Sequence, residues 1–180
     1  NIVAVGLDSA EAGYPAHRHK EAFRRARELG YYLTAHAGEA YGPVSIWDSL
    51  DEAGCGRIDH GVRAVEDPEL VNRLARDHIF LTVCPLSNLA LKVFPDMEHH
   101  SIKQLMDAGV PVSINSDDPP FFCGDLNENY EAVVRTFRLA KPELHALAKS
   151  AFTNSYAPQT MVNGWIQELD DYFSENDFIL

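Results

Sequence analysis

A repeated alternation of strand and helix is the feature that most constrains the fold of this chain. Short apolar runs recur along the sequence, and segments with apolar residues at helical spacing lie between them. Strands that are continuously apolar are typical of a parallel sheet covered by helices on both faces. The predicted strands cover residues 1–9, 31–36, 56–61, 79–84 and 110–115. The predicted helices cover residues 21–29, 43–53, 101–108, 127–140, 143–152 and 161–173, and one more begins at residue 67.

Polar residues gather where the predicted strands end. In a (β/α)8 barrel the chemistry sits at the C-terminal ends of the strands. In a doubly wound sheet the ligand binds at a switch point, usually beside a glycine-rich first turn. No Gly-x-Gly-x-x-Gly pattern follows any predicted strand, so the barrel is favoured. The polar residues at the strand ends are Asp8, His36, Glu39, Asp59, His60, Asn88, Asp117 and Asp118.

The segment 110–119 combines a predicted strand with two adjacent carboxylates, Asp117 and Asp118. Neighbouring carboxylates raise the free energy needed to ionise each other unless a cation or a hydrogen-bond donor lies nearby. Pro119 and Pro120 are expected to stop regular structure after them. By itself this pattern also fits a polar turn that caps the next helix, so its meaning depends on the other strand ends.

Composition excludes several classes of partner and site. The net charge of −12 argues against nucleic acid or an anionic membrane as partner. No apolar run is long enough to span a bilayer, and the start does not resemble a signal peptide. The three cysteines form no Cys-x-x-Cys pair, which argues against a structural zinc knuckle. We therefore expect reduced thiols and a cytoplasmic protein.

The residues at the strand ends have the chemistry of a hydrolytic metal site. His36 and Asp117 offer a nitrogen and an oxygen ligand of the kind that suits zinc or a similar divalent ion. Glu39 can face the same site without binding the metal, and His60 and Asp118 add an imidazole and a carboxylate. Taken singly, such residues are more often structural or solvated. Five of them at consecutive strand ends favour a shared catalytic function.

Four segments resemble the consecutive motifs of the adenosine/adenine deaminase family, a branch of the metal-dependent amidohydrolases. They are His-Ala-Gly-Glu at 36–39, Arg-Ile-Asp-His-Gly at 57–61, Cys-Pro-Leu-Ser-Asn at 84–88 and Ser-Asp-Asp-Pro at 116–119. The resemblance runs in order from about residue 2 to about residue 156. It implies a purine as small-molecule substrate and Zn2+ as cofactor.

The resemblance also implies a role for each site residue. His36 and Asp117 would bind zinc. Glu39 would protonate the purine ring nitrogen beside the attacked carbon, and His60 would help to deprotonate and hold the zinc-bound water. Asp118 would hydrogen-bond the imidazole-ring nitrogen of the purine. Hydroxide would add to C6, and ammonia would leave.

Smaller sequence differences bear on the substrate. Enzymes for adenosine usually carry Gly before the His of the second motif and Thr before the paired Asp, whereas this chain has Asp59 and Ser116. Together with residues 6–9 and 83–88, these choices resemble the adenine deaminase subgroup. We expect deamination of adenine to hypoxanthine, with Ser9, Asp59 and Asp118 contacting the substrate. Adenosine or a modified adenine nucleoside is the alternative.

The chain departs from the family pattern at its start. The family has a His-x-His on its first strand that supplies two more zinc ligands, and the only His-x-His here, at 17–19, precedes a helix. We do not assign residues 17–19 to zinc, and the pair His99 and His100 is expected to be a polar cap region. Two protein ligands are too few for a catalytic zinc, which normally has at least three.

This departure predicts an incomplete barrel. The expected fold is the C-terminal part of a TIM-type (β/α)8 barrel, about strands four to eight, without the N-terminal strands. Residues 1–157 would form this partial barrel, and residues 158–180 a C-terminal helix and tail. Activity would require an N-terminal segment or a second chain that completes the barrel.

Two other functions remain open. A catalytically incomplete partial barrel could bind a purine or a partner protein, and a zinc titration would separate this reading from the enzyme. A phosphotriesterase-like hydrolase is less favoured, because those enzymes often use a carboxylated lysine at a strand end and no lysine ends a predicted strand here.

Overall fold

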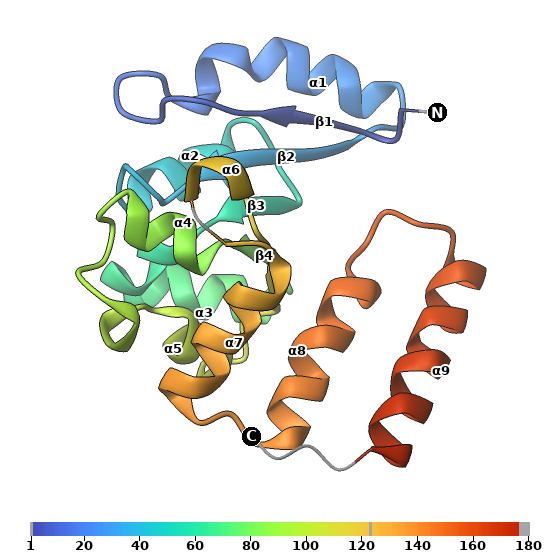
Figure 1. Ribbon diagram of the computed structural model, residues 1–180. Coiled ribbons are helices and arrows are strands. Elements are labelled where there is room, and N and C mark those ends of the chain that lie inside the picture. The colour runs from blue at the N-terminus through green and yellow to red at the C-terminus, as the bar shows by residue number, and fades with distance from the viewer. Residues whose placement is uncertain (1, 123, 177–180) are drawn as a thin grey trace. The chain divides into compact units, whose positions relative to one another are not determined.

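The computed structural model describes residues 2–122 and 124–176. Its strands follow the chain in a five-stranded sheet of order β1-β2-β3-β4-β5, of which Figure 1 labels β1 to β4. Pairing is parallel from β1 to β4, with Ala4 opposite Tyr32 and His36 opposite Asp59. The predicted parallel sheet is therefore confirmed. The strands are β1 (Ala4–Leu7), β2 (Tyr32–Ala37), β3 (Arg57–His60), β4 (Phe80–Val83) and β5 (Val112–Ile114).

Helices connect the strands, as the periodicity of the sequence predicts. They are η1 (Ala16–His19), α1 (Lys20–Glu28), α2 (Pro43–Asp51), η2 (Val62–Glu66), α3 (Pro68–Arg76), α4 (Pro85–Ala90), η3 (Met97–His99), α5 (Ile102–Asp107), α6 (Pro119–Phe122), α7 (Leu126–Phe137), α8 (Lys141–Thr153) and α9 (Gln159–Glu175). Within residues 2–122 and 124–176, none of these helices combines the length and the apolar character needed to cross a membrane.

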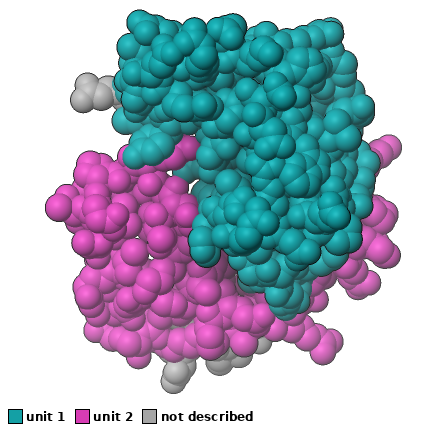
Figure 2. Space-filling model, turned by 180° about the vertical axis from the view of Figure 1, so that it is seen from behind, with its two compact units in different colours: residues 1–83, 100–111 teal, residues 84–99, 112–180 magenta. Residues whose placement is uncertain are grey.

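The chain divides into two compact units, shown in different colours in Figure 2. Unit 1 comprises residues 1–83 and 100–111, and unit 2 comprises residues 84–99 and 112–180. Unit 1 contains β1 to β4 with α1, α2, α3 and α5, and unit 2 contains β5 with α4 and α6 to α9.

Unit 1 has an aliphatic core built from strand and helix residues. Burying each large aliphatic side chain contributes roughly 1.5–3 kcal/mol. Helix α3 is a clear case, since Asp67 caps its N-terminus by accepting the backbone N–H groups of Glu69 and Leu70, and Pro68 occupies its first turn. The fully buried large side chains of unit 1 are Ile46, Ile58, Val62, Leu70, Leu74, Leu81, Val83, Ile102 and Leu105.

Unit 2 is mainly helical. Helix α7 begins with a capping box in which Asp125 and Glu128 satisfy backbone N–H groups at its N-terminus. Helices α8 and α9 lie side by side (Figure 1), and Asp170 of α9 accepts hydrogen bonds from Lys149 of α8 at 3.0 Å. Leu147 of α8 and Val162 of α9 are both buried.

Two local expectations are wrong. The first strand is not buried, because Ile2 and Val3 are 76% and 47% exposed and β1 is the edge strand of the order found. Pro119 and Pro120 do not stop regular structure but begin α6, since proline is tolerated in the first turn of a helix. The cap expected at His100 is present, since Nδ1 of His100 accepts the backbone N–H of Ile102 at the start of α5 at 3.1 Å, but the residue is buried, with only 3% exposed.

The predicted boundary at residues 157 and 158 stays a prediction, although α9 does begin at Gln159. Within the expected C-terminal helix and tail at 158–180, the helix α9 runs to Glu175, and residues 177–180 lie outside the described residues, as does Cys123. Cys55 and Cys84 are both buried thiols, and burial raises the pKa of Cys55 to about 12.

Candidate active site

His36 and Asp59 lie next to each other at the ends of two adjacent strands. Residues 33, 35 and 37 of β2 are buried, so Thr34 and His36 project from the other face of the sheet. His36 is the register partner of Asp59 in β3, and Asp59 is the register partner of Thr82 in β4. One row of polar side chains therefore crosses three strands near their C-terminal ends.

The Asp59 carboxylate is held from both sides. Thr34 Oγ1 donates to Oδ2 of Asp59, and Thr82 Oγ1 donates to Oδ1, each at 2.7 Å. The same Oδ2 atom lies 3.7 Å from Nδ1 of His36. Hydrogen bonds on both oxygens fix the rotamer of Asp59, which presents a fixed negative charge to the His36 imidazole.

His36 has the surroundings expected of a metal ligand. Its Nδ1 atom is buried and has no hydrogen-bond partner among the described residues, although Oδ1 of Asp8 lies 3.2 Å away. Burying a polar atom without a partner is unfavourable, so such an atom is a candidate to bind a group from outside the chain. An imidazole nitrogen is a common zinc ligand, and the carboxylates of Asp8 and Asp59 lie beside this one.

Glu39 and His60 form a second pair in the same unit. Oε1 of Glu39 lies 3.2 Å from Nδ1 of His60, and His60 is 2% exposed. The rings of His36 and His60 meet edge to face, with centroids 4.9 Å apart. His60 adopts φ +66° and Gly61 follows at φ +72°. A non-glycine residue in the left-handed region is strained, and such strain is common at active sites.

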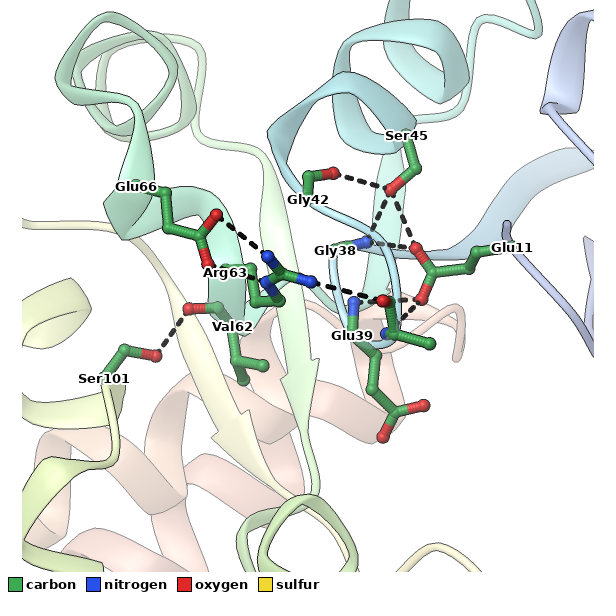
Figure 3. A network of polar contacts seen from close by, with 10 residues as sticks. Glu11, Gly38, Glu39, Gly42, Ser45, Val62, Arg63, Glu66 and Ser101 are labelled. Carbon is green, nitrogen blue, oxygen red and sulfur yellow. Dashed lines mark hydrogen bonds and ion pairs between the residues drawn. The ribbon is translucent and has the colours of Figure 1, made fainter. Parts of the chain in front are cut away.

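Glu11 is a site residue that sequence reasoning missed. Its oxygens accept the backbone N–H groups of Gly38, Glu39 and Ala40 at 2.7 to 2.9 Å and the hydroxyl of Ser45 at 2.8 Å (Figure 3). Glutamate in a surface loop is usually solvated, so position alone carried no signal. Its place three residues after Asp8, at the end of a strand, was the only available hint.

Ser9 lies in the loop after β1 and adopts φ +78°. Together with Asp8, Glu11, His36 and Ser45 it lines a cavity of about 10 Å³, which has room for about one water molecule. The structure therefore places Ser9 beside the predicted metal ligand of unit 1.

Asp117 and Asp118 share one turn of unit 2. Asp117, at φ +59°, accepts a hydrogen bond from the Ser87 hydroxyl at 2.7 Å through Oδ2. The backbone carbonyl of Asp118 accepts the N–H groups of Phe121 and Phe122, which starts α6. The two carboxylates thus occupy the turn after β5, as the sequence predicts for a strand end.

The predicted site residues form two groups, one in each unit. The third motif contributes Ser87, which orients Asp117. The His-x-His at 17–19 lies at the start of the helical segment, where His17 Nδ1 is 2.7 Å from Oδ1 of Asp48, and not at a strand end. In unit 1 the structure brings together Ser9, His36, Glu39, Asp59 and His60, and in unit 2 Asp117 and Asp118.

Curated relatives of this chain carry the name adenine deaminase. The protein from Cupriavidus necator is 46% identical over 173 residues, which are 96% of this chain and 49% of the relative. The protein from Acinetobacter baylyi is 45% identical over 170 residues, which are 94% of this chain and 51% of the relative. The chain thus spans about half the length of the curated relatives it matches.

Solved structures of deaminases and of an amidohydrolase also match nearly the whole of this chain. An adenine deaminase from Arthrobacter aurescens matches with a TM-score of 0.93 at 35% identity, over 96% of this chain and 53% of that one. An amidohydrolase from Burkholderia ambifaria, solved with bound Zn, matches with a TM-score of 0.84 at 25% identity, over 97% and 51%. An Arabidopsis N6-mAMP deaminase matches with a TM-score of 0.81 at 25% identity, over 97% and 50%.

These matches confirm the predicted fold, the C-terminal part of a TIM-type barrel. A family model described as adenosine deaminase matches residues 1–172, which is nearly the whole chain. The chain therefore belongs to the adenosine deaminase family.

Proposed function

We propose that the protein carrying this chain is a zinc-dependent aminohydrolase that converts adenine and water into hypoxanthine and ammonia. It would thus be a hydrolase acting on the C–N bond of a cyclic amidine. The observation that carries the proposal is the contact between Glu39 and His60 beside His36, at the ends of adjacent strands. The relatives named adenine deaminase support adenine as the substrate.

Zinc is supported by the donors and by one neighbour. His36 and Asp117 would hold the ion, and the buried Nδ1 of His36 without a hydrogen-bond partner fits that role. The Burkholderia neighbour was solved with bound Zn. The metal would supply a water molecule of lowered pKa at neutral pH. Further ligands would come from residues outside this chain, since a catalytic zinc normally has at least three protein ligands.

Glu39 and His60 would handle the protons. Glu39 in its acid form would donate a proton to the ring nitrogen beside C6, which offsets the charge that develops on the purine. His60 would accept the proton of the attacking water. Glu39 and His60 lie 3.2 Å apart, which suits a reaction in which one group adds a proton to the ring nitrogen and the other removes a proton from the water that attacks C6.

Asp118 would hold the purine through a hydrogen bond to its imidazole-ring nitrogen. Ser9 and Asp59 would complete the substrate contacts in unit 1. Both oxygens of Asp59 already accept hydrogen bonds from Thr34 and Thr82, which also supports a role in orienting His36.

A nucleotide or nucleoside substrate is the second candidate. The observation that favours it is the match to an Arabidopsis N6-mAMP deaminase. A partial barrel that binds a purine or a protein without catalysis is the candidate from another class. The net charge of −12 supports a small-molecule ligand over nucleic acid or an anionic membrane, and we propose a cytoplasmic location.

Ammonia release from adenine, adenosine and N6-methyl-AMP, measured on the zinc-loaded protein, tests these alternatives. We expect the highest kcat/KM for adenine. A higher value for adenosine or N6-methyl-AMP would reassign the substrate. Tight zinc binding without ammonia from any of the three would favour the non-catalytic binding protein.

A further inference from the structure

Glu11 is a buried carboxylate with an unusual set of partners. It is 8% exposed, and its four donors are three backbone N–H groups of the loop between β2 and α2 and the hydroxyl of Ser45 in the first turn of α2. One donor is the backbone N–H of Glu39 itself. We propose that Glu11 is a positioning residue that fixes the turn carrying the catalytic acid Glu39. This inference rests on the function proposed above.

The turn is shaped to receive a carboxylate. Three successive backbone N–H groups, from Gly38 to Ala40, point at the two oxygens of Glu11 (Figure 3). Successive N–H groups of this kind form an anion-binding concavity. Hydrogen bonds to a charged acceptor are roughly twice as strong as those between neutral groups. Gly38 adopts φ +71°, and a Cβ atom there would collide with Ile46, so the turn requires glycine.

Ser45 ties the carboxylate to helix α2. Its hydroxyl lies 2.8 Å from Oε2 of Glu11 and 2.9 Å from the carbonyl of Gly42, and its oxygen accepts the N–H of Gly38 at 2.8 Å. Because Ser45 is in the first turn of α2, its hydrogen bonds anchor both Glu11 and the turn at residues 38–40 to this helix. The position of Glu39 is thereby set by the scaffold of unit 1.

Arg63 binds the same turn by donating hydrogen bonds to the carbonyl groups of Gly38 and Ala40. The backbone N–H of Arg63 donates to the carbonyl of Gly38 at 2.9 Å, and its Nη1 donates to the carbonyl of Ala40 at 3.2 Å. The Arg63 guanidinium is itself bound by both oxygens of Glu66 at 2.6 and 3.1 Å, and this hydrogen bonding raises the pKa of Arg63. Amides are held by Glu11 and carbonyls by Arg63.

The side chain of Glu39 extends away from these bonds (Figure 3), and its Oε1 lies 3.2 Å from His60. With its backbone fixed, Glu39 can reach this position through side-chain rotation alone. A displacement of about 1 Å in a catalytic group can lower the rate by about 100-fold. Among residues 2–122 and 124–176, the hydrogen bonds of Glu11 go to Gly38, Glu39, Ala40 and Ser45 and not to His36 or Asp117, so we expect Glu11 to affect turnover and not metal binding.

The test compares Glu11→Gln with wild type in the zinc-loaded protein. Glutamine keeps the shape but replaces one oxygen with an NH2 group, which cannot accept an N–H. We expect kcat for adenine to fall about 10-fold to 100-fold. KM and bound zinc should stay within about twofold of wild type. The amide proton resonances of Gly38, Glu39 and Ala40 should shift upfield. The matched control is Glu21→Gln, because Glu21 is an exposed carboxylate of α1 that pairs with Arg24.

The outcomes separate this inference from the proposed function. A wild-type protein that releases no ammonia from adenine overturns the proposed function and removes the catalytic acid that Glu11 would position. An active wild type with unchanged kcat in Glu11→Gln overturns the inference alone. If Glu11→Gln loses zinc or does not fold, Ser45→Ala decides: a lower kcat at constant KM supports positioning, and an unchanged kcat overturns it.

Discussion

Oε1 of Glu39 lies 3.2 Å from Nδ1 of His60, and the His60 side chain is almost fully buried. The two residues come from the turn after β2 and the end of β3, which are adjacent in the parallel sheet. A parallel sheet places consecutive strand ends at one edge, so residues far apart in sequence can share a site.

Replacing Glu39 tests its role as the acid. Glu39→Gln removes a proton donor and no metal ligand, so we expect turnover of adenine to fall by about 100-fold to 10,000-fold. Bound zinc, measured by elemental analysis, should stay at the wild-type level. Loss of zinc in the variant would mean that Glu39 binds metal and is not the acid. Glu21→Gln, an exposed glutamate exchanged for the same amide, is the control.

Replacing Asp117 tests the metal assignment. Asp117→Ala removes a carboxylate ligand, so the variant should bind zinc at least tenfold more weakly in a titration against a competing chelator. The matched control is Asp118→Asn, a change at the next residue that should keep zinc and raise KM for adenine. Equal zinc affinity in Asp117→Ala and wild type would contradict the assignment of Asp117.

Replacing Asp59 tests the substrate preference. Asp59→Gly introduces the residue that adenosine enzymes carry before the motif histidine, so the ratio of kcat/KM for adenine over adenosine should fall. It also removes the acceptor of the Thr34 and Thr82 hydroxyls. The variant Thr82→Val, which removes one of these hydrogen bonds and keeps the carboxylate, controls for that loss. If the ratio stays constant in Asp59→Gly, another residue discriminates the substrates.

His100 should make the protein less stable in acid. Burial lowers the pKa of His100 from its ordinary 6.5 to about 4 in the folded protein. Between these values the unfolded chain binds a proton that the folded chain excludes, so stability rises with pH in this window. As pH falls from about 6.5 to about 4, the free energy of unfolding should decrease by up to about 3 kcal/mol from this group.

Urea unfolding of wild type and His100→Asn over that pH range measures this effect. Asparagine can still accept the backbone N–H of Ile102, which now donates to Nδ1 of His100. The pH dependence should be shallower in the variant, because the contributions of all other titrating groups cancel in the comparison. Identical pH dependence in the two proteins would show that His100 does not resist protonation.

Much of the candidate site was predictable because its residues follow local patterns. The alternation of apolar strands and helices predicts a parallel sheet, and the order of the chain then places His36 and His60 at the ends of β2 and β3 and Asp117 after β5. The errors arose where burial depends on distant segments. The apolar run at β1 predicted a buried strand, but a strand at the edge of a sheet has a neighbour on one side only. The cap at His100 was predictable, but only the tertiary packing shows that the residue is buried.

The sequence by itself determined the strand–helix order and the residue types at each strand end, because both depend on local periodicity and covalent connectivity. The tertiary structure alone decided which of those groups meet. Glu11 binds amides 27 to 29 residues away, and Asp59 is held by threonines 25 and 23 residues away. Such contacts depend on strand register and on the packing of helices against the sheet. A local pattern cannot specify either, since each is set by the whole core at once.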